Sequence, residues 1–98
     1  MQPLNNVEFY EADSALFECR VQGHYLNIQW FKGNQPLENP FRYKMSYDEL
    51  SGMARLFIAT CLREDAGEYT CQVANKIGEI SSTAHLILIG ENNFKCYF

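Results

Sequence analysis

Hydrophobic and polar residues alternate along most of the chain with a period of two, and the sequence holds no helical repeat of useful length. Successive side chains of a β-strand point to opposite faces, so alternation of this kind is typical of strands with one buried face. Short polar runs rich in Gly, Asn and Asp separate the alternating segments. The pattern predicts an all-β chain with strands at residues 7–10, 15–22, 27–32, 35–37, 42–47, 53–59 and 68–74, and a last strand that ends near residue 89.

Alternation also assigns each side chain to one face of its strand. Trp30, Leu56 and Tyr69 fall on inward faces, and we place them in a single hydrophobic core. Phe31 and Ile87 fall on outward faces. Exposed apolar side chains are common on monomers, and only a contiguous patch indicates a partner. Phe31 and Ile87 are therefore candidates for a protein-binding face, with scattered surface exposure as the alternative.

Length and composition fit one small folded domain. The chain has 98 residues, of which 47% are hydrophobic and 20% charged, as in an ordinary globular domain. We expect residues 1–90 to form a single domain and residues 91–98 to form a C-terminal tail. The apolar side chains of this tail either dock on a protein surface or stay free, and the sequence leaves both alternatives open.

Charge and hydropathy exclude several classes of partner. The net charge is −4 and the Lys and Arg residues are scattered, so the sequence offers no basic patch for nucleic acid or an anionic membrane. No segment approaches the roughly 18 apolar residues of a membrane helix, and residues 1–10 lack the pattern of a secretory signal peptide. We expect a protein partner or neighbouring domains of the same chain, with no nucleic acid, no membrane span in this segment and no small-molecule substrate.

The four cysteines, at positions 19, 61, 71 and 96, do not follow a metal-binding pattern, because no Cys-x-x-Cys occurs and the spacings match no zinc motif. His24 and His85 are far apart in the sequence and have no nucleophile placed for catalysis. The sequence therefore predicts no catalytic site, no metal and no cofactor, and a chain that is not an enzyme. Cys61 takes an apolar position before a turn and is interpreted as a core residue, whereas Cys96 is interpreted as an unpaired thiol of the tail.

One set of spaced residues is more specific than the alternation. Trp30 follows Cys19 by eleven residues, and Cys71 follows a tyrosine by two. In chain order the full set is Cys19, Trp30, Leu56, Ile58, Asp65, Gly67, Tyr69, Cys71, Asn75 and Gly78. This set resembles the intermediate set, or I-set, of immunoglobulin domains over about residues 7–89. The resemblance implies an all-β fold, a two-sheet antiparallel immunoglobulin-like β-sandwich.

The segment between the motifs distinguishes this sequence from other members of the superfamily. Only 25 residues separate Trp30 from Leu56, which leaves little room for the extra pair of strands of a variable-type domain. The sequence departs from the I-set pattern at Tyr25 and Leu26, where prolines are usual. The resemblance therefore favours an I-set domain with an unusual loop before Trp30.

The resemblance also implies roles for several of these residues. Cys19 and Cys71 are expected to face each other across the two sheets, bonded in an oxidising compartment or buried as two thiols in a reducing one. Tyr69 is expected to return its hydroxyl group to the backbone near the preceding turn. Asp65 is expected to pair with a basic residue at the base of the edge strand, for which Arg42 is the candidate.

The domains that the sequence most resembles are those of intracellular muscle and cytoskeletal proteins of the titin, myosin-binding-protein, obscurin and palladin type. Two cysteines outside the family pair and the lack of an Asn-x-Ser/Thr glycosylation acceptor favour this comparison. The resemblance implies a non-catalytic structural and protein-interaction module in the cytoplasm, at the sarcomere or cytoskeleton. The alternative is an extracellular domain of an adhesion molecule or receptor that recognises a protein ligand at the cell surface.

Overall fold

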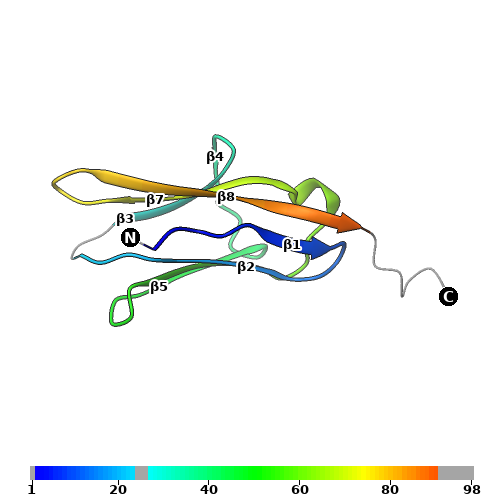
Figure 1. The fold of residues 1–98 in the computed structure, drawn as a ribbon, viewed down its shortest axis with the longest axis horizontal. Coiled ribbons are helices and arrows are strands. Elements are labelled where there is room, and N and C mark those ends of the chain that lie inside the picture. The colour runs from blue at the N-terminus through cyan, green and yellow to red at the C-terminus, as the bar shows by residue number, and fades with distance from the viewer. Residues whose placement is uncertain (1, 24–26, 91–98) are drawn as a thin grey trace.

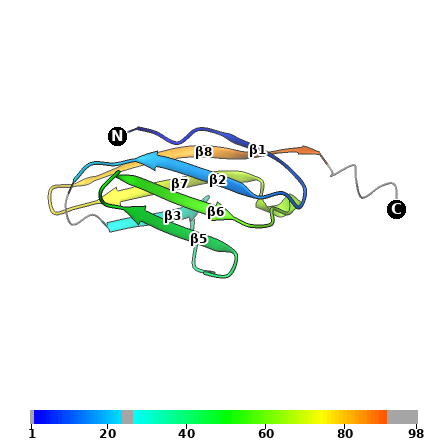
Figure 2. The same ribbon diagram turned by 90° about the horizontal axis from the view of Figure 1, so that it is seen from below.

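The computed structural model describes residues 2–23 and 27–90 of the chain. Its elements are β1 (Val7–Tyr10), β2 (Ala15–Arg20), β3 (Asn27–Lys32), β4 (Gln35–Pro36), β5 (Tyr43–Asp48), β6 (Met53–Ile58), the 3₁₀ helix η1 (Arg63–Asp65), β7 (Gly67–Ala74) and β8 (Glu79–Gly90). The strands form a five-stranded sheet in the order β1-β8-β7-β3-β4 and a three-stranded sheet in the order β2-β6-β5. The two sheets pack face to face (Figures 1 and 2), which confirms the predicted two-sheet sandwich. The loop residues His24, Tyr25 and Leu26 and the tail with Cys96 lie outside the described residues.

Every predicted strand is present, and the ends of most differ by one or two residues from the prediction. β2 ends at Arg20 rather than at residue 22, and β5 begins at Tyr43, so Arg42 lies just before the strand. The backbone turns tightly at Gly52, where the Val21 N–H donates to the Gly52 oxygen over 2.8 Å. Gly52 has a φ of +77°, and a Cβ there would lie 2.5 Å from the Val21 oxygen, so only glycine fits this hairpin.

One strand pair differs from the antiparallel pairing of the others, because β1 runs parallel to β8. The chain starts on the other sheet, where Gln2 and Arg20 exchange two backbone hydrogen bonds of 2.9 and 3.1 Å. The next N–H that could continue that ladder is that of Leu4. The Leu4 N–H donates to Ser82 Oγ of β8 over 2.8 Å, and the chain continues alongside β8. The first ten residues therefore cross from one sheet to the other.

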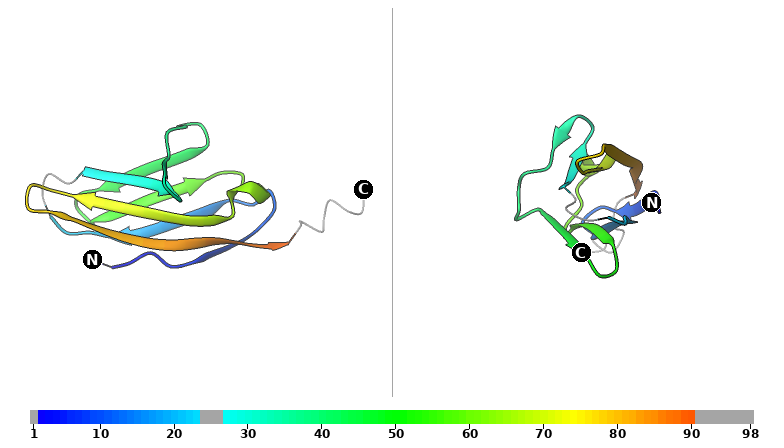
Figure 3. Two further views of the ribbon diagram at one scale, coloured as in Figure 1. Left: turned by 90° about the horizontal axis from the view of Figure 1, so that it is seen from above. Right: turned by 90° about the vertical axis from the view of Figure 1, so that its left-hand side faces the viewer.

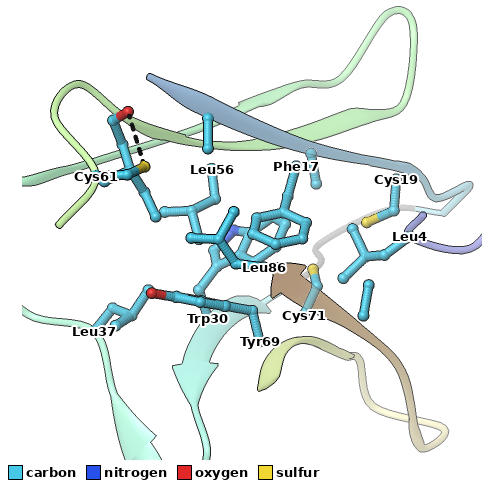
Figure 4. Packing of buried hydrophobic residues seen from close by; sticks show 14 of the residues in the cluster. Leu4, Phe17, Cys19, Trp30, Leu37, Leu56, Cys61, Tyr69, Cys71 and Leu86 are labelled. Atoms are coloured by element: carbon cyan, nitrogen blue, oxygen red, sulfur yellow. Dashed lines mark hydrogen bonds between the residues drawn. The ribbon is translucent and has the colours of Figure 1, made fainter. Parts of the chain in front are cut away.

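The hydrophobic core lies between the two sheets and forms one cluster, part of which Figure 4 shows. Its least exposed side chains, at 0–2% of their surface, include Phe17, Cys19, Trp30, Leu56, Ile58, Cys61, Tyr69, Cys71 and Leu86. The Phe17 and Tyr69 rings meet at a centroid distance of 5.2 Å from opposite sheets. Because burial of one large apolar side chain contributes roughly 1.5–3 kcal/mol, this cluster is the main source of stability.

Candidate functional site

The two motif cysteines come together at the centre of the core. Cys19 is on β2 of one sheet and Cys71 on β7 of the other, and their sulfur atoms turn toward each other (Figure 4). Both are buried thiols. The hydrogen bond with Cys19, together with burial, raises the pKa of Cys71 above its ordinary range, so this thiol stays protonated at neutral pH.

Trp30 lies directly beside this pair, because it is opposite Cys71 in the β3–β7 ladder. Its side chain is 2% exposed. Among the described residues, its Nε1 is the one buried side-chain nitrogen or oxygen without a hydrogen-bond partner. An orphaned donor of this kind costs about 1–3 kcal/mol, so the indole is retained here for its volume rather than for a polar contact.

A second buried group, Asp65, organises the turn before β7. Its Oδ2 accepts a hydrogen bond from Arg42 Nη2 over 2.5 Å and another from the Leu62 N–H over 2.7 Å. Arg42 also donates to the Thr60 carbonyl over 3.1 Å. The Tyr69 hydroxyl donates to the Asp65 carbonyl over 2.7 Å. Residues of η1, β7 and the segment before β5 are thus tied together, and we call Arg42, Asp65 and Tyr69 the Asp65 network.

Ionisation of the groups around this network is shifted by their surroundings. The hydrogen bond that Arg42 donates to the Asp65 carboxylate raises the pKa of Arg42, which keeps the guanidinium charged. Burial raises the pKa values of Tyr69 and Tyr43, so both phenols stay neutral at physiological pH. The Asp65 network therefore consists of one partly buried ion pair, in which the Arg42 side chain is 33% exposed, and neutral neighbours. This arrangement holds a turn.

Cys61 lies close to the Asp65 network and is fully buried. Its backbone N–H donates to the Asp13 carbonyl and its carbonyl accepts from the Ala12 N–H, each over 2.7 Å. Burial raises the pKa of the Cys61 thiol to about 11. Because the thiolate is the reactive form, this thiol belongs with structural core residues rather than with reactive cysteines.

The two candidates for a partner face lie apart on the outer surface of the five-stranded sheet. Phe31 is half-buried and is opposite Thr70, whereas Ile87 is 41% exposed and pairs with Glu8 of β1. The row formed by Glu68 and His85 lies between them, with Glu68 Oε2 and His85 Nε2 3.8 Å apart. The structure therefore does not bring Phe31 and Ile87 into one contiguous apolar patch.

Two apolar surface features were not found from the sequence. A groove of about 280 Å³ is lined by Val21, Val73, Ile77 and Ile80 beside the β7–β8 hairpin. At the other end of β8, Tyr10 and Ile89 are exposed near Ile87. Alternation places Ile89 outward, but the proximity of Tyr10 follows from the parallel β1–β8 pairing, which the sequence pattern does not reveal.

Residues 2–23 and 27–90 contain no group of three or more His, Cys, Asp or Glu side chains placed to hold a metal ion. Within the same residues no helix is long and apolar enough to cross a membrane. This segment shows no enzymatic feature.

The whole sandwich matches a known family. The family model described as the immunoglobulin I-set domain matches residues 1–88. The chain belongs to the immunoglobulin I-set family. Most of the I-set motif residues of the sequence build the core or the Asp65 network, while Asn75 and Gly78 bond to each other in the β7–β8 turn.

Curated I-set relatives come from much longer proteins. Titin of Drosophila melanogaster is 42% identical over 72 residues, covering 70% of this chain and 0%, to the nearest per cent, of titin. Palladin of Mus musculus is 31% identical over 102 residues, covering 97% of this chain and 7% of palladin. The muscle M-line assembly protein unc-89 of Caenorhabditis elegans is 29% identical over 92 residues, covering 94% and 1%. This chain spans a small part of each, and these relatives are muscle and cytoskeletal proteins.

Solved titin domains share the I-set fold closely. A titin M10 complex with obscurin-like 1 gives a TM-score of 0.85 at 25% identity, covering 94% of this chain and 93% of the other. Titin Z1Z2 in complex with telethonin gives 0.84 at 28% identity, covering 93% and 47%. I-set domains of this kind thus occur in complexes with other proteins.

Proposed function

We propose that this I-set domain is a non-catalytic structural and protein-interaction module of a larger muscle or cytoskeletal protein, working in the cytoplasm at the sarcomere or cytoskeleton. The observation that carries the proposal is the match over most of the chain to titin, palladin and unc-89. The fold suits a module in series, because the N-terminal segment and the end of β8 lie toward opposite ends of the long axis (Figure 1).

The proposed partner is a protein, or a neighbouring domain of the same parent chain. Obscurin-like 1 and telethonin are partners of titin domains, and they support the class of partner rather than its identity. On this chain the outer face of the five-stranded sheet offers Phe31 and, separately, Ile87. Each is an independent contact point in the proposal, because polar side chains separate them.

A localisation experiment tests the function. The chain fused to a fluorescent protein is expressed in striated muscle cells, and we expect it to concentrate in a regular striated pattern. Phe31→Asp is expected to weaken the pattern without unfolding the domain, and Leu50→Asp, at a side chain that is 99% exposed on a hairpin, is the matched control. Uniform fluorescence of the wild-type fusion would argue against the proposal.

The extracellular adhesion or receptor domain is a second candidate, favoured by one observation. Cys19 and Cys71 face each other across the core, as a disulfide requires. Mass spectrometry of protein taken from its native cell, after thiol blocking without reductant, separates the two candidates. Two blocked thiols support the cytoplasmic module, and a quantitative Cys19–Cys71 bond supports the extracellular one.

A further inference from the structure

The outer faces of the two sheets differ in charge. On the described strands of the five-stranded sheet, alternation and register direct three carboxylates outward and no Lys or Arg: Glu8, Glu68 and Glu79. The outer face of the three-stranded sheet carries both signs: Glu18, Arg20, Lys44, Asp48 and Arg55. Interfaces pair surfaces of opposite potential, so a charged partner of the five-stranded sheet is expected to be basic.

A hollow of about 290 Å³ lies on this outer face, beside the turn that joins β3 to β4. The β3–β4 hairpin rises from the outer side of the sheet (Figures 1 and 3), and its turn residues Gly33 and Asn34 line one side of the hollow. Phe31, Glu68 and Gln72 also line it. We call this space the Phe31 hollow. It combines a half-buried aromatic ring with polar side chains on a negatively charged face.

Strand register brings the ring and a carboxylate together in the Phe31 hollow. Phe31 is directly opposite Thr70, so Glu68, two residues before Thr70, is a diagonal neighbour of Phe31 on the same face. Diagonal neighbours lie roughly 7–8 Å apart, within reach of one long side chain. Glu68 is exposed, and His85 Nε2 lies 3.8 Å from its Oε2, beyond hydrogen-bond distance. The Glu68 carboxylate is therefore accessible to a donor from a partner.

We propose that the Phe31 hollow binds an arginine side chain of the protein partner. The inference rests on the proposed function and names the chemistry of its partner. A guanidinium group stacks on an aromatic ring with its planar face and donates hydrogen bonds within its own plane. Phe31 supplies the ring and Glu68 the charged acceptor, while the Gln72 amide, held by a 2.9 Å hydrogen bond to Glu79, lines the hollow beside them.

The make-up of the Phe31 hollow favours arginine over other side chains. An apolar side chain would cover Glu68 without pairing its charge, and an acidic one would repel it. Lysine offers a compact charge that cannot both stack on Phe31 and donate through a planar fork. The lysine of β3 itself does not fill the hollow, because Lys32 falls on the opposite face from Phe31 and its Nζ donates to the Glu64 carbonyl.

Binding of two small compounds to the purified 98-residue chain tests the proposal. The probes are N-acetyl-arginine amide and N-acetyl-citrulline amide, which has nearly the same shape but no charge. In two-dimensional NMR titrations we expect the arginine compound to shift the backbone amide signals of Phe31 and Thr70. Its affinity should exceed that of the citrulline compound by about fivefold or more, because a charged donor strengthens the bond to Glu68. Equal affinities of the two compounds would overturn the proposal.

Variants of the chain locate the arginine site. Glu68→Gln keeps the size of the side chain and removes its charge, and we expect it to lower the affinity for the arginine compound by about fivefold or more. Phe31→Leu removes the ring but stays apolar, and we expect a loss of about threefold. Glu8→Gln is the matched control, because it removes the same charge from the same face outside the hollow. Equal losses in Glu8→Gln and Glu68→Gln would indicate diffuse attraction and overturn the proposal.

The fluorescent fusion in striated muscle cells separates this proposal from the proposed function. We expect the Glu68→Gln fusion to lose the striated pattern that the wild-type fusion forms, and the Glu8→Gln fusion to keep it. A striated Glu68→Gln fusion would overturn arginine recognition and leave the assignment as a module in place. Uniform fluorescence of the wild type would argue against the proposed function, whereas the titrations of the purified chain decide the arginine site independently.

Discussion

The centre of the core and the Asp65 network both contain fully buried side chains, but these side chains have different roles. At the centre, Cys19 and Cys71 meet between two sheets whose backbone groups are already paired, so side chains there need only fill space. At the turn, the irregular backbone around η1 leaves donors and acceptors to satisfy, and Asp65 and Arg42 bond to them.

This difference separates two kinds of stability. The centre even tolerates the orphaned Trp30 Nε1, because the volume of the ring outweighs one missing hydrogen bond. In the Asp65 network, removal of one member leaves a buried polar group without one of its hydrogen bonds, and no gain in packed volume offsets that loss. Changes in covalent bonding or side-chain volume at the centre should therefore alter the stability of the domain. At the turn, the removal of polar side chains should do so.

Oxidation of the central pair should have the largest effect. A Cys19–Cys71 disulfide closes a loop of about fifty residues, and the chain-entropy model gives about 4 kcal/mol of stabilisation for a loop of that length. We expect urea unfolding of oxidised and reduced protein, both in a Cys61→Val, Cys96→Ser background, to differ by this amount. Cys71→Ala in the same background should show no gain on oxidation, and an equal gain there would remove the central pair from the explanation.

Deletion of the buried carboxylate should come next. Asp65→Ala removes a charged hydrogen-bond acceptor from both Arg42 and the Leu62 N–H, and we expect a loss of about 2–3 kcal/mol in the free energy of unfolding. The matched control is Glu64→Ala, because Glu64 is the neighbouring exposed carboxylate. Equal losses in the two variants would contradict the role given to the network.

The tyrosine hydroxyl should contribute less. Tyr69→Phe keeps the ring in the core but removes the hydrogen bond to the Asp65 carbonyl, and we expect a loss of about 1–1.5 kcal/mol in urea unfolding. Tyr10→Phe, at an exposed phenol, should be neutral. A neutral Tyr69→Phe would mean that the carbonyl finds another donor.

The Cys61 thiol should have the smallest effect on the free energy of unfolding, and this effect appears only at alkaline pH. Its pKa is raised from 9.0 to about 11, so the folded state holds the thiol proton more tightly than the unfolded state. The resulting stability is fully present below pH 9 and is lost as the pH rises through about 11. We expect stability to fall less steeply between pH 9 and 11 in Cys61→Val than in the wild type, by about 1 kcal/mol at pH 10. Parallel curves would place the thiol outside the core.

Alternation and motif spacing predicted most of the fold because they report which face of a strand is buried. The same periodicity places Trp30 and Tyr69 inward and Phe31 outward, and it locates every strand within a few residues. It carries no information on strand direction, so the parallel run of β1 beside β8 was missed. That pairing depends on where the chain leaves β2, at Leu4, whose N–H bonds to Ser82 of β8 instead.

The surfaces were harder to predict than the interior. Whether Phe31 and Ile87 touch depends on strand order and register across three strands, and Glu68 and His85 lie between them only because β7 pairs with β8 in this register. The pairing of Arg42 with Asp65 followed from the family resemblance alone, since 23 residues separate the two in sequence. Long-range geometry of this kind is invisible to periodicity.

The crossing of the first ten residues between the sheets has a mechanical consequence. Gln2 is bonded to β2, while β1 is bonded to β8, so one short segment is anchored to both layers. Sliding of one sheet over the other must therefore stretch or detach this segment as well as disturb the packed core. A truncation before residue 7 would remove this main-chain link between the layers while leaving each ladder intact.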